Sequence, residues 1–178
     1  MSRSQRGLRI ASRYLLSKRD RRKVEDEVMR EVGGEYAQRA READRVEIAL
    51  VKHSEVSEAY FLDGTLALVR TMGAGLIPSL YFMYKNNVYP SYPSVYVDAG
   101  AVPRILNGAD VMVPGIKKVE GEFSPNAKVL VRELEKGRVI AVGVSLMSSQ
   151  EIRTSGKGKA VKSLHYLGDE IWEASVEA

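Results

Sequence analysis

The sequence has no cysteine among its 178 residues, which excludes disulfides, thiolate zinc sites and cysteine nucleophiles. It has two histidines, His53 and His165, and neither belongs to a recognisable metal-ligand motif, so we expect no metal. The longest charge-free stretch near the middle, 71–84, is well short of the roughly 20 apolar residues that span a bilayer. We therefore expect no membrane segment, and a cytoplasmic location.

Motifs of catalysis are also missing. Gly73 and Gly75 could begin a dinucleotide-binding loop, but Pro78 stands where its third glycine belongs. The sequence contains no nucleophile elbow and no HExxH motif, and the part before the prolines near residue 90 is small for an RNA-modifying domain. We expect no catalytic residues and no cofactor.

Charge is distributed unevenly along the chain. The net charge is +4, and residues 1–30 hold ten Lys and Arg against four Asp and Glu. Arginines at the very start, including Arg3 and Arg6, interrupt any apolar core of a signal peptide. Residues 165–178 carry four acidic residues and no Lys or Arg. This asymmetry favours a nucleic-acid partner, while a solvated helix face is the alternative for a charge run taken alone.

Periodicity in the first half predicts a mixed α/β domain. Valines recur at helical spacing after Ser17 or Asp20, either of which can cap a helix that ends at Gly33-Gly34. Asp63-Gly64 between two apolar runs predicts a hairpin. The expected strands are 9–16, 45–51, 59–62 and 65–69, and the expected helices are 17–32 and 78–84.

The second half predicts short strands at close intervals, as in a small barrel. Pro90 and Pro93 mark a boundary, which gives an N-terminal domain over 1–90 and a second domain over 91–178. Ser148 and Glu151 have capping-box spacing for a helical turn. We expect strands at 95–97, 111–113, 128–134, 138–146 and 160–166, a short helix from about 101, and a last strand around 171–172 with Trp172 in the barrel core.

The second half resembles a PUA domain, an RNA-binding module. The resemblance rests on Val95-Tyr-Val-Asp-Ala-Gly100-Ala-Val102, on Leu106-Asn-Gly-Ala-Asp-Val-Met-Val-Pro-Gly-Ile116, on Val139-Ile-Ala-Val-Gly-Val144 and on His165-Tyr-Leu-Gly-Asp-Glu-Ile-Trp172. The whole chain is similar to the malignant T-cell amplified sequence family and its archaeal relatives. The resemblance implies an α+β fold, in which a small N-terminal α/β domain precedes a PUA-type β-barrel of short strands with short helices.

The same resemblance implies a function in translation. Family members act with the small ribosomal subunit, so the expected partners are tRNA or ribosomal RNA, during initiation or recycling. A separate partner protein with an initiation-factor-like domain is also implied. Two alternatives stay open, namely an RNA-modification enzyme or its accessory subunit, and a protein-binding adaptor that does not bind RNA and docks an acidic partner on the basic helix near Arg19–Lys23.

The expected RNA-binding residues lie in the PUA-like half. Glycines would let a sugar-phosphate backbone approach closely, a short helix starting near Ala101 would offer free N–H groups, and Lys and Arg would neutralise phosphates. Glycines that only shape turns are the alternative. His165 is expected to be a packed structural histidine. The candidate RNA-binding residues are Gly100, Ala101, Arg104, Gly108, Gly115, Lys117, Lys118, Lys157 and Lys159.

Overall fold

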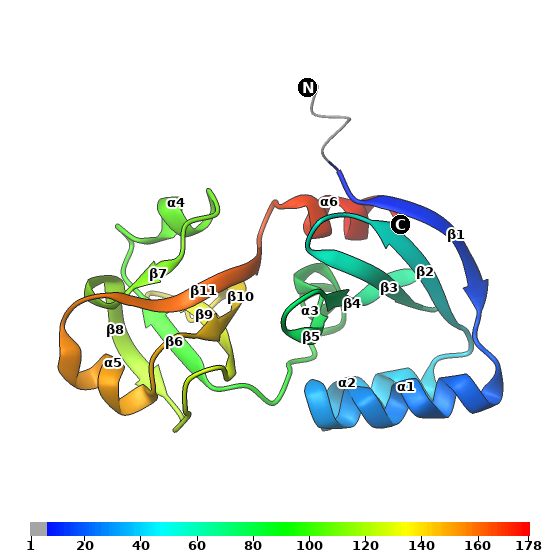
Figure 1. Ribbon diagram of the computed structural model, residues 1–178, viewed down its shortest axis with the longest axis horizontal. Helices are drawn as coiled ribbons and strands as arrows, with labels where there is room; N and C mark the ends of the chain where they lie inside the picture. Colours follow the sequence, from blue (N-terminus) through cyan, green and yellow to red (C-terminus); the bar gives the residue numbers. More distant parts are fainter. Residues whose placement is uncertain (1–6) are drawn as a thin grey trace. The chain divides into compact units, whose positions relative to one another are not determined.

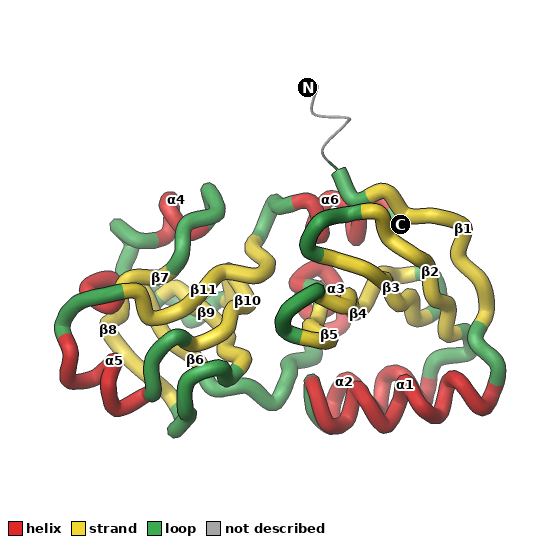
Figure 2. Tube along the Cα trace, viewed as in Figure 1, coloured by secondary structure: helices red, strands yellow, loops and turns green. Residues whose placement is uncertain are grey.

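The computed structural model describes residues 7–178 and divides the chain into two compact units (Figures 1 and 2). The first unit contains the chain up to Ser91 together with Glu170–Ala178, and the second contains Tyr92–Asp169. The C-terminal segment therefore belongs to the first unit, whereas the sequence analysis placed it in the second domain. Arg3 and Arg6, part of the basic N-terminal run, lie outside the described residues.

The first unit is built on a five-stranded antiparallel sheet in chain order. Its central hairpin turns at Asp63 and Gly64, whose φ angles are 47° and 86°, as the Asp-Gly pair predicts. Pro78 ends a strand, so the helix expected from that residue begins later. The strands are β1 (Arg9–Leu15), β2 (Val46–Lys52), β3 (Val56–Leu62), β4 (Thr65–Thr71) and β5 (Gly75–Pro78).

Helices α1 (Lys18–Glu31) and α2 (Gly34–Glu42) cover one face of this sheet (Figure 1). Of the two predicted caps for α1, Ser17 is the correct one, since its hydroxyl accepts from the Asp20 N–H at 3.1 Å. Helix α2 was not expected. The buried residues of α2 have helical spacing, but this spacing indicates a second helix only if Gly33 and Gly34 form a corner between two helices. The buried residues are Tyr36, Ala37 and Ala40.

Helices α3 (Leu80–Asn86) and α6 (Glu170–Glu177) complete the first unit, and α6 packs on β4 and α3. The predicted strand around 171–172 is wrong, because this segment is helical and buries Ile171 and Ser175 one turn apart. The prediction that Trp172 closes the barrel is wrong for the same reason. Its ring makes edge contacts with Tyr81 and Tyr84 at centroid distances of 5.5 and 6.3 Å.

A half-buried charge network joins α1 to the sheet. Arg70 on β4 donates two hydrogen bonds to Glu27 of α1, at 2.8 and 2.7 Å, and one to Glu58 of β3 at 2.9 Å. Burial, together with the hydrogen bond that Tyr60 donates to Glu58, raises the pKa of Tyr60 to about 12. The network fixes the second half of α1 against the sheet.

The second unit is a curled six-stranded sheet with the order β7-β11-β10-β9-β6-β8 (Figure 1). Strand β6 pairs with β9 in parallel and with β8 antiparallel, so the start of the unit's sequence lies between strands from its middle. The strands are β6 (Ser94–Val97), β7 (Val111–Met112), β8 (Ile116–Glu120), β9 (Lys128–Glu133), β10 (Val139–Ser145) and β11 (Lys159–Tyr166). The sequence analysis predicted all of these except β8.

Short helices close the second unit: α4 (Val102–Ile105), the 3-10 turn η2 (Val113–Gly115) and α5 (Ser149–Ser155). The predicted capping box is confirmed, because the Ser148 hydroxyl accepts from the Glu151 N–H and the Glu151 carboxylate accepts from the Ser148 N–H. His165 is fully buried, with Nδ1 2.9 Å from Asp169 Oδ2, so it is a packed structural histidine as predicted. Over residues 7–178, no helix is long and apolar enough to cross a membrane.

Candidate nucleic-acid interface

A cavity of about 700 Å³ lies on the second unit, where α4, η2 and the ends of β7 and β11 meet. Ile105, Val111, Met112 and Pro114 give it apolar walls, and Arg104 and Lys159 bring two cations to it. Volumes of this size are typical of small-ligand sites. Of the nine residues predicted from the sequence, five line this cavity: Ala101, Arg104, Gly108, Gly115 and Lys159.

Two glycines line the cavity. Gly108 has a φ of +96°, a conformation that side chains disfavour, and a Cβ there would meet the Tyr166 hydroxyl at 3.4 Å. A Cβ on Gly115 would lie 3.1 Å from the Cβ of Ala101. A side chain at either position would therefore press on a neighbouring residue of the second unit.

The electrostatics of the cavity are mixed. Asp110 accepts from the Ser163 N–H at 2.9 Å and lies 3.6 Å from the Lys159 ammonium. The lysine is exposed, so this ion pair is weak and can open to let Lys159 meet another anion. The carboxylate is fixed by its backbone bond, and it can accept a hydrogen bond from a ribose hydroxyl or a base amine. The site can thus hold a phosphate and a polar group together.

The other four predicted residues are not among those that line the cavity. Lys117 is close to it, since its ammonium donates to the carbonyl of Pro114 at 3.1 Å and lies 3.7 Å from Asp98 Oδ2. Lys118 lies over the Tyr96 ring at 4.7 Å, 3.7 Å from Glu120. The register of β8 shifts between Ile116 and Lys118, so both lysines are exposed, and they differ in what they contact. The remaining two, Gly100 and Lys157, also lie outside the cavity lining.

The predicted free N–H at the start of the short helix is wrong for Ala101. Its amide donates to Asp98, to the side-chain oxygen at 3.0 Å and to the carbonyl oxygen at 3.1 Å. Asp98 is therefore a turn residue that positions α4. The Ala101 amide is therefore engaged within the protein and does not face the cavity as a free donor.

Sequence reasoning missed Asp110 and the apolar walls. Asp110 lies two residues after the Asn107-Gly108 turn and directly before β7, and this position between a turn and a strand was the only signal for it. The apolar residues are scattered over α4, β7 and η2, so that only the fold brings them together. Tyr96, next to Lys118, has its pKa raised by burial and by the hydrogen bond that it donates to Glu120.

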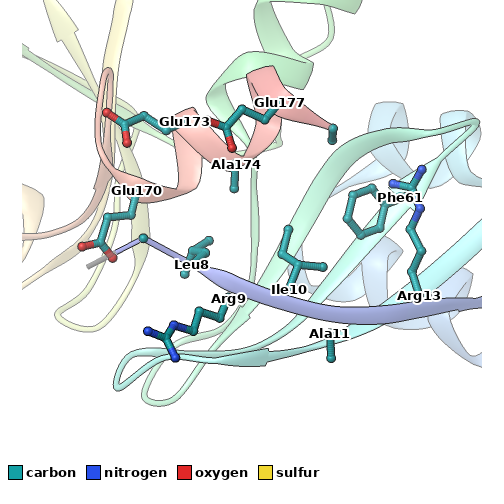
Figure 3. A pocket seen from close by; sticks show the side chains of 12 residues that line it. Leu8, Arg9, Ile10, Ala11, Arg13, Phe61, Glu170, Glu173, Ala174 and Glu177 are labelled. Carbon is teal, nitrogen blue, oxygen red and sulfur yellow. The ribbon is translucent and has the colours of Figure 1, made fainter. Parts of the chain in front are cut away.

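The first unit has a different cavity, of about 680 Å³, between β1 and α6 (Figure 3). Glu170, Glu173 and Glu177 line it from α6, opposite Arg9 and Arg13 of β1. Arg13 is already engaged, because its guanidinium lies 4.4 Å from the centre of the Phe61 ring and 3.6 Å from Glu47. Three carboxylates on one wall repel phosphate, so this cavity is not the counterpart of the one on the second unit.

Each of the two units matches a known protein family. Residues 93–167 match the PUA domain, and residues 12–86 match a domain of unknown function, DUF1947. The chain is 32% identical to Translation machinery-associated protein 20 of Saccharomyces cerevisiae, over 74% of this chain and 74% of that protein. It is 31% identical to human Malignant T-cell-amplified sequence 2, over 70% of each. The chain belongs to the malignant T-cell-amplified sequence family.

Archaeal proteins resemble this family member over nearly its whole length. An uncharacterized protein of Methanocaldococcus jannaschii is 34% identical over 93% of this chain and 98% of its own. The solved structure of a hypothetical protein from Pyrococcus horikoshii has a TM-score of 0.76 at 31% identity, covering 92% of this chain and 99% of that one. A PUA domain structure from Aeropyrum pernix gives 0.78 at 27%, covering 95% and 92%. The α+β fold with a C-terminal PUA domain is therefore that of the family.

Proposed function

We propose that this protein binds RNA through the cavity of its PUA domain and acts in the translation machinery of the cytoplasm. The proposal rests mainly on one observation. A single cavity with apolar walls is lined by two cations, Arg104 and Lys159, and by two glycines, Gly108 and Gly115. The names of the family relatives, which refer to translation machinery, support a role in that process. The favoured targets are tRNA and small-subunit ribosomal RNA during initiation or recycling.

The cavity chemistry suits an unpaired nucleotide. Its apolar walls, including Ile105 and Met112, offer contact for a base or a ribose face. Arg104 and Lys159 can neutralise the flanking phosphates, and the Asp110 carboxylate can accept from a ribose hydroxyl, which DNA lacks. Sequence-specific RNA recognition mostly targets single-stranded loops and ends, whose bases can enter such a cavity.

We infer a binding role in preference to an RNA-modification enzyme, because the named relatives are translation proteins. By analogy with the family resemblance, the small ribosomal subunit and a separate protein with an initiation-factor-like domain are the proposed partners. An adaptor that does not bind RNA is the competing function, and it predicts no RNA affinity for the cavity.

The test is titration of unfractionated tRNA and a small-subunit RNA transcript at several salt concentrations. Replacing both cavity cations, Arg104→Ala and Lys159→Ala, should flatten the log–log salt dependence of affinity by about 1.4 units, at roughly 0.7 for each single-strand phosphate contact. A matched control, Lys136→Ala with Arg138→Ala, removes the same charge at exposed positions of the β9–β10 turn. If the cavity variant and the control bind RNA equally well, this assignment of the cavity is wrong.

A further inference from the structure

Helix α1 carries its charges in the reverse of the order that would stabilise it. Its first two turns present four exposed cations: Lys18, Arg19, Arg22 and Lys23. Its second half carries Glu25, Asp26, Glu27 and Glu31 against one cation, Arg30. The helix dipole is positive at the N-terminus, so cations there and anions at the far end are both unfavourable.

The spacing of the cations adds to this cost. Lys18 and Arg22 are four residues apart, and so are Arg19 and Lys23, which places like charges side by side on the helix surface. Asp20 is the single acidic residue of the first turn. No ion pair involving any of the four cations is present among the described residues, whereas Arg21, between them, pairs with Glu25 at 3.3 Å. Helix stability therefore does not explain these four residues.

The acidic half, by contrast, has a structural explanation. Glu27 accepts both hydrogen bonds from Arg70, which ties α1 to the sheet. Arg21 is structural as well, because its guanidinium donates to the carbonyls of Ala40 and Arg41 at 2.9 and 3.1 Å and to that of Ala43, at the end of α2. Cations at a helix C-terminus are favourable, so this contact stabilises α2. The exposed cations of the first two turns remain without a role in the fold.

The contact of Arg21 with the end of α2 fixes the position of the cations at the start of α1. It places the start of α1 against the backbone of residues 40–44, and this segment with Arg45 is neutral, since exposed Glu42 and Asp44 balance exposed Arg41 and Arg45. Residues 16–28 of the described chain include no large apolar side chain that is exposed; the exposed apolar residues nearest to them in the sequence are Tyr14, Leu15 and Met29. A protein partner needs an apolar or aromatic centre, whereas a phosphate backbone needs only cations.

We propose that Lys18, Arg19, Arg22 and Lys23, here called the α1 basic patch, form a second RNA-contact surface that binds phosphates without reading sequence. The proposal rests on the proposed function, because it adds a surface to an RNA-binding protein. The patch contributes affinity and salt dependence, and the PUA cavity contributes selectivity for an unpaired nucleotide. Arginines suit this role because their forked donors match phosphate geometry.

The experiment uses the full chain and the same two RNAs, unfractionated tRNA and the small-subunit transcript. Arg19→Ala with Lys23→Ala should lower affinity about tenfold to thirtyfold at 0.1 M salt and flatten the log–log slope by about 1.4. The control, Arg30→Ala with Lys52→Ala, removes equal charge from exposed positions outside the patch and should bind as the unaltered protein does. The patch variant should also melt about 1 to 3 °C higher, since a like-charge pair is removed.

The outcomes separate the two proposals. If the unaltered protein binds neither RNA, the proposed function fails. If it binds and the cavity variant is weakened while the patch variant matches its control, the α1 basic patch alone is wrong. If the patch variant keeps its RNA affinity but loses an acidic protein that copurifies with the unaltered chain, the patch is a protein-docking site and the inference is overturned.

Discussion

The PUA cavity and the α1 basic patch present cations in opposite ways. In the cavity, two cations from separate elements, Arg104 and Lys159, lie among apolar residues and two glycines that only the fold brings together. In the patch, four cations come from six consecutive residues of one regular helix. The first arrangement depends on the fold, and the second depends only on a formed helix.

Because of this difference, we expect the two surfaces to differ in how well they select one RNA over another. A cavity excludes ligands by shape and by polar groups that demand partners, as the fixed carboxylate of Asp110 does. A row of exposed cations accepts any closely spaced phosphates and is weakened by salt. Damage to the packing of the second unit should therefore abolish selectivity, while damage to the charge of the first unit should reduce affinity for all RNAs alike.

The largest effect is expected from overpacking β10 at Gly143. A Cβ there would approach the Lys162 carbonyl oxygen at 2.6 Å and would also clash with a methyl group of Val161 on β11. Gly143→Val should therefore destabilise the second unit by about 3 kcal/mol, measured by urea denaturation. Gly73→Ala is the control, because no atom lies within 4 Å of its added Cβ, and it should change stability by less than about 0.5 kcal/mol.

Gly143→Val also tests whether the two surfaces are separable. The variant should lose the PUA cavity and with it any preference between RNAs, while the α1 basic patch keeps a weak, salt-sensitive affinity. Equal unfolding curves for Gly143→Val and Gly73→Ala would show that β10 and β11 can separate at no cost in stability. That result would contradict the expectation that the PUA cavity depends on the packing of the second unit.

The next effect concerns Arg70, which holds α1 to the sheet. Arg70→Met removes three charged hydrogen bonds and leaves Glu27 and Glu58 half-buried without their partner. The expected loss is about 2 kcal/mol in the first unit, measured by urea denaturation. Arg30→Met, at an exposed position of the same helix, is the control.

The Arg70 variant should also change the response to acid. Burial raises the pKa of Glu58, but hydrogen bonds from Tyr60 and Arg70 outweigh burial and leave this pKa below its ordinary value of 4.5. A lowered pKa in the folded state contributes stability that is present above about pH 4.5 and is lost as the pH falls through the folded value. Stability of Arg70→Met should therefore fall less steeply below pH 4.5; an unchanged acid limb would contradict this account of the network.

Most of the fold could be predicted because local signals marked the element ends. The Ser17 cap, the Asp63-Gly64 turn and the capping box at Ser148 each act through contacts within a few residues. Helix α2 and helix α6 could not be read in this way. Both are short, and α6 shows its helical period only across Ile171 and Ser175, which are buried by elements far away in the sequence.

The candidate site was predictable in its glycines and less so in its lysines. Gly108 and Gly115 follow from a motif that fixes the backbone. The pair Lys117-Lys118 looks like one basic cluster in the sequence, but Lys117 contacts Pro114 while Lys118 contacts Tyr96 and Glu120. Without a predicted strand at 116–120, the sequence could not assign different contacts to the two lysines.

The smallest effect is the most discriminating, because it compares two adjacent lysines. Lys117 lies beside Pro114 at the edge of the PUA cavity, while Lys118 is held over Tyr96. Lys117→Ala should flatten the salt dependence of RNA affinity by about 0.7, the share of one single-strand phosphate contact, and Lys118→Ala should leave it unchanged. Both should keep stability within about 0.5 kcal/mol, since both side chains are exposed.

The measurement is tRNA titration at four salt concentrations with each single variant. Equal slopes for the two variants, flattened or not, would mean that the RNA does not distinguish Lys117 from Lys118, and that the cavity does not determine where the RNA binds.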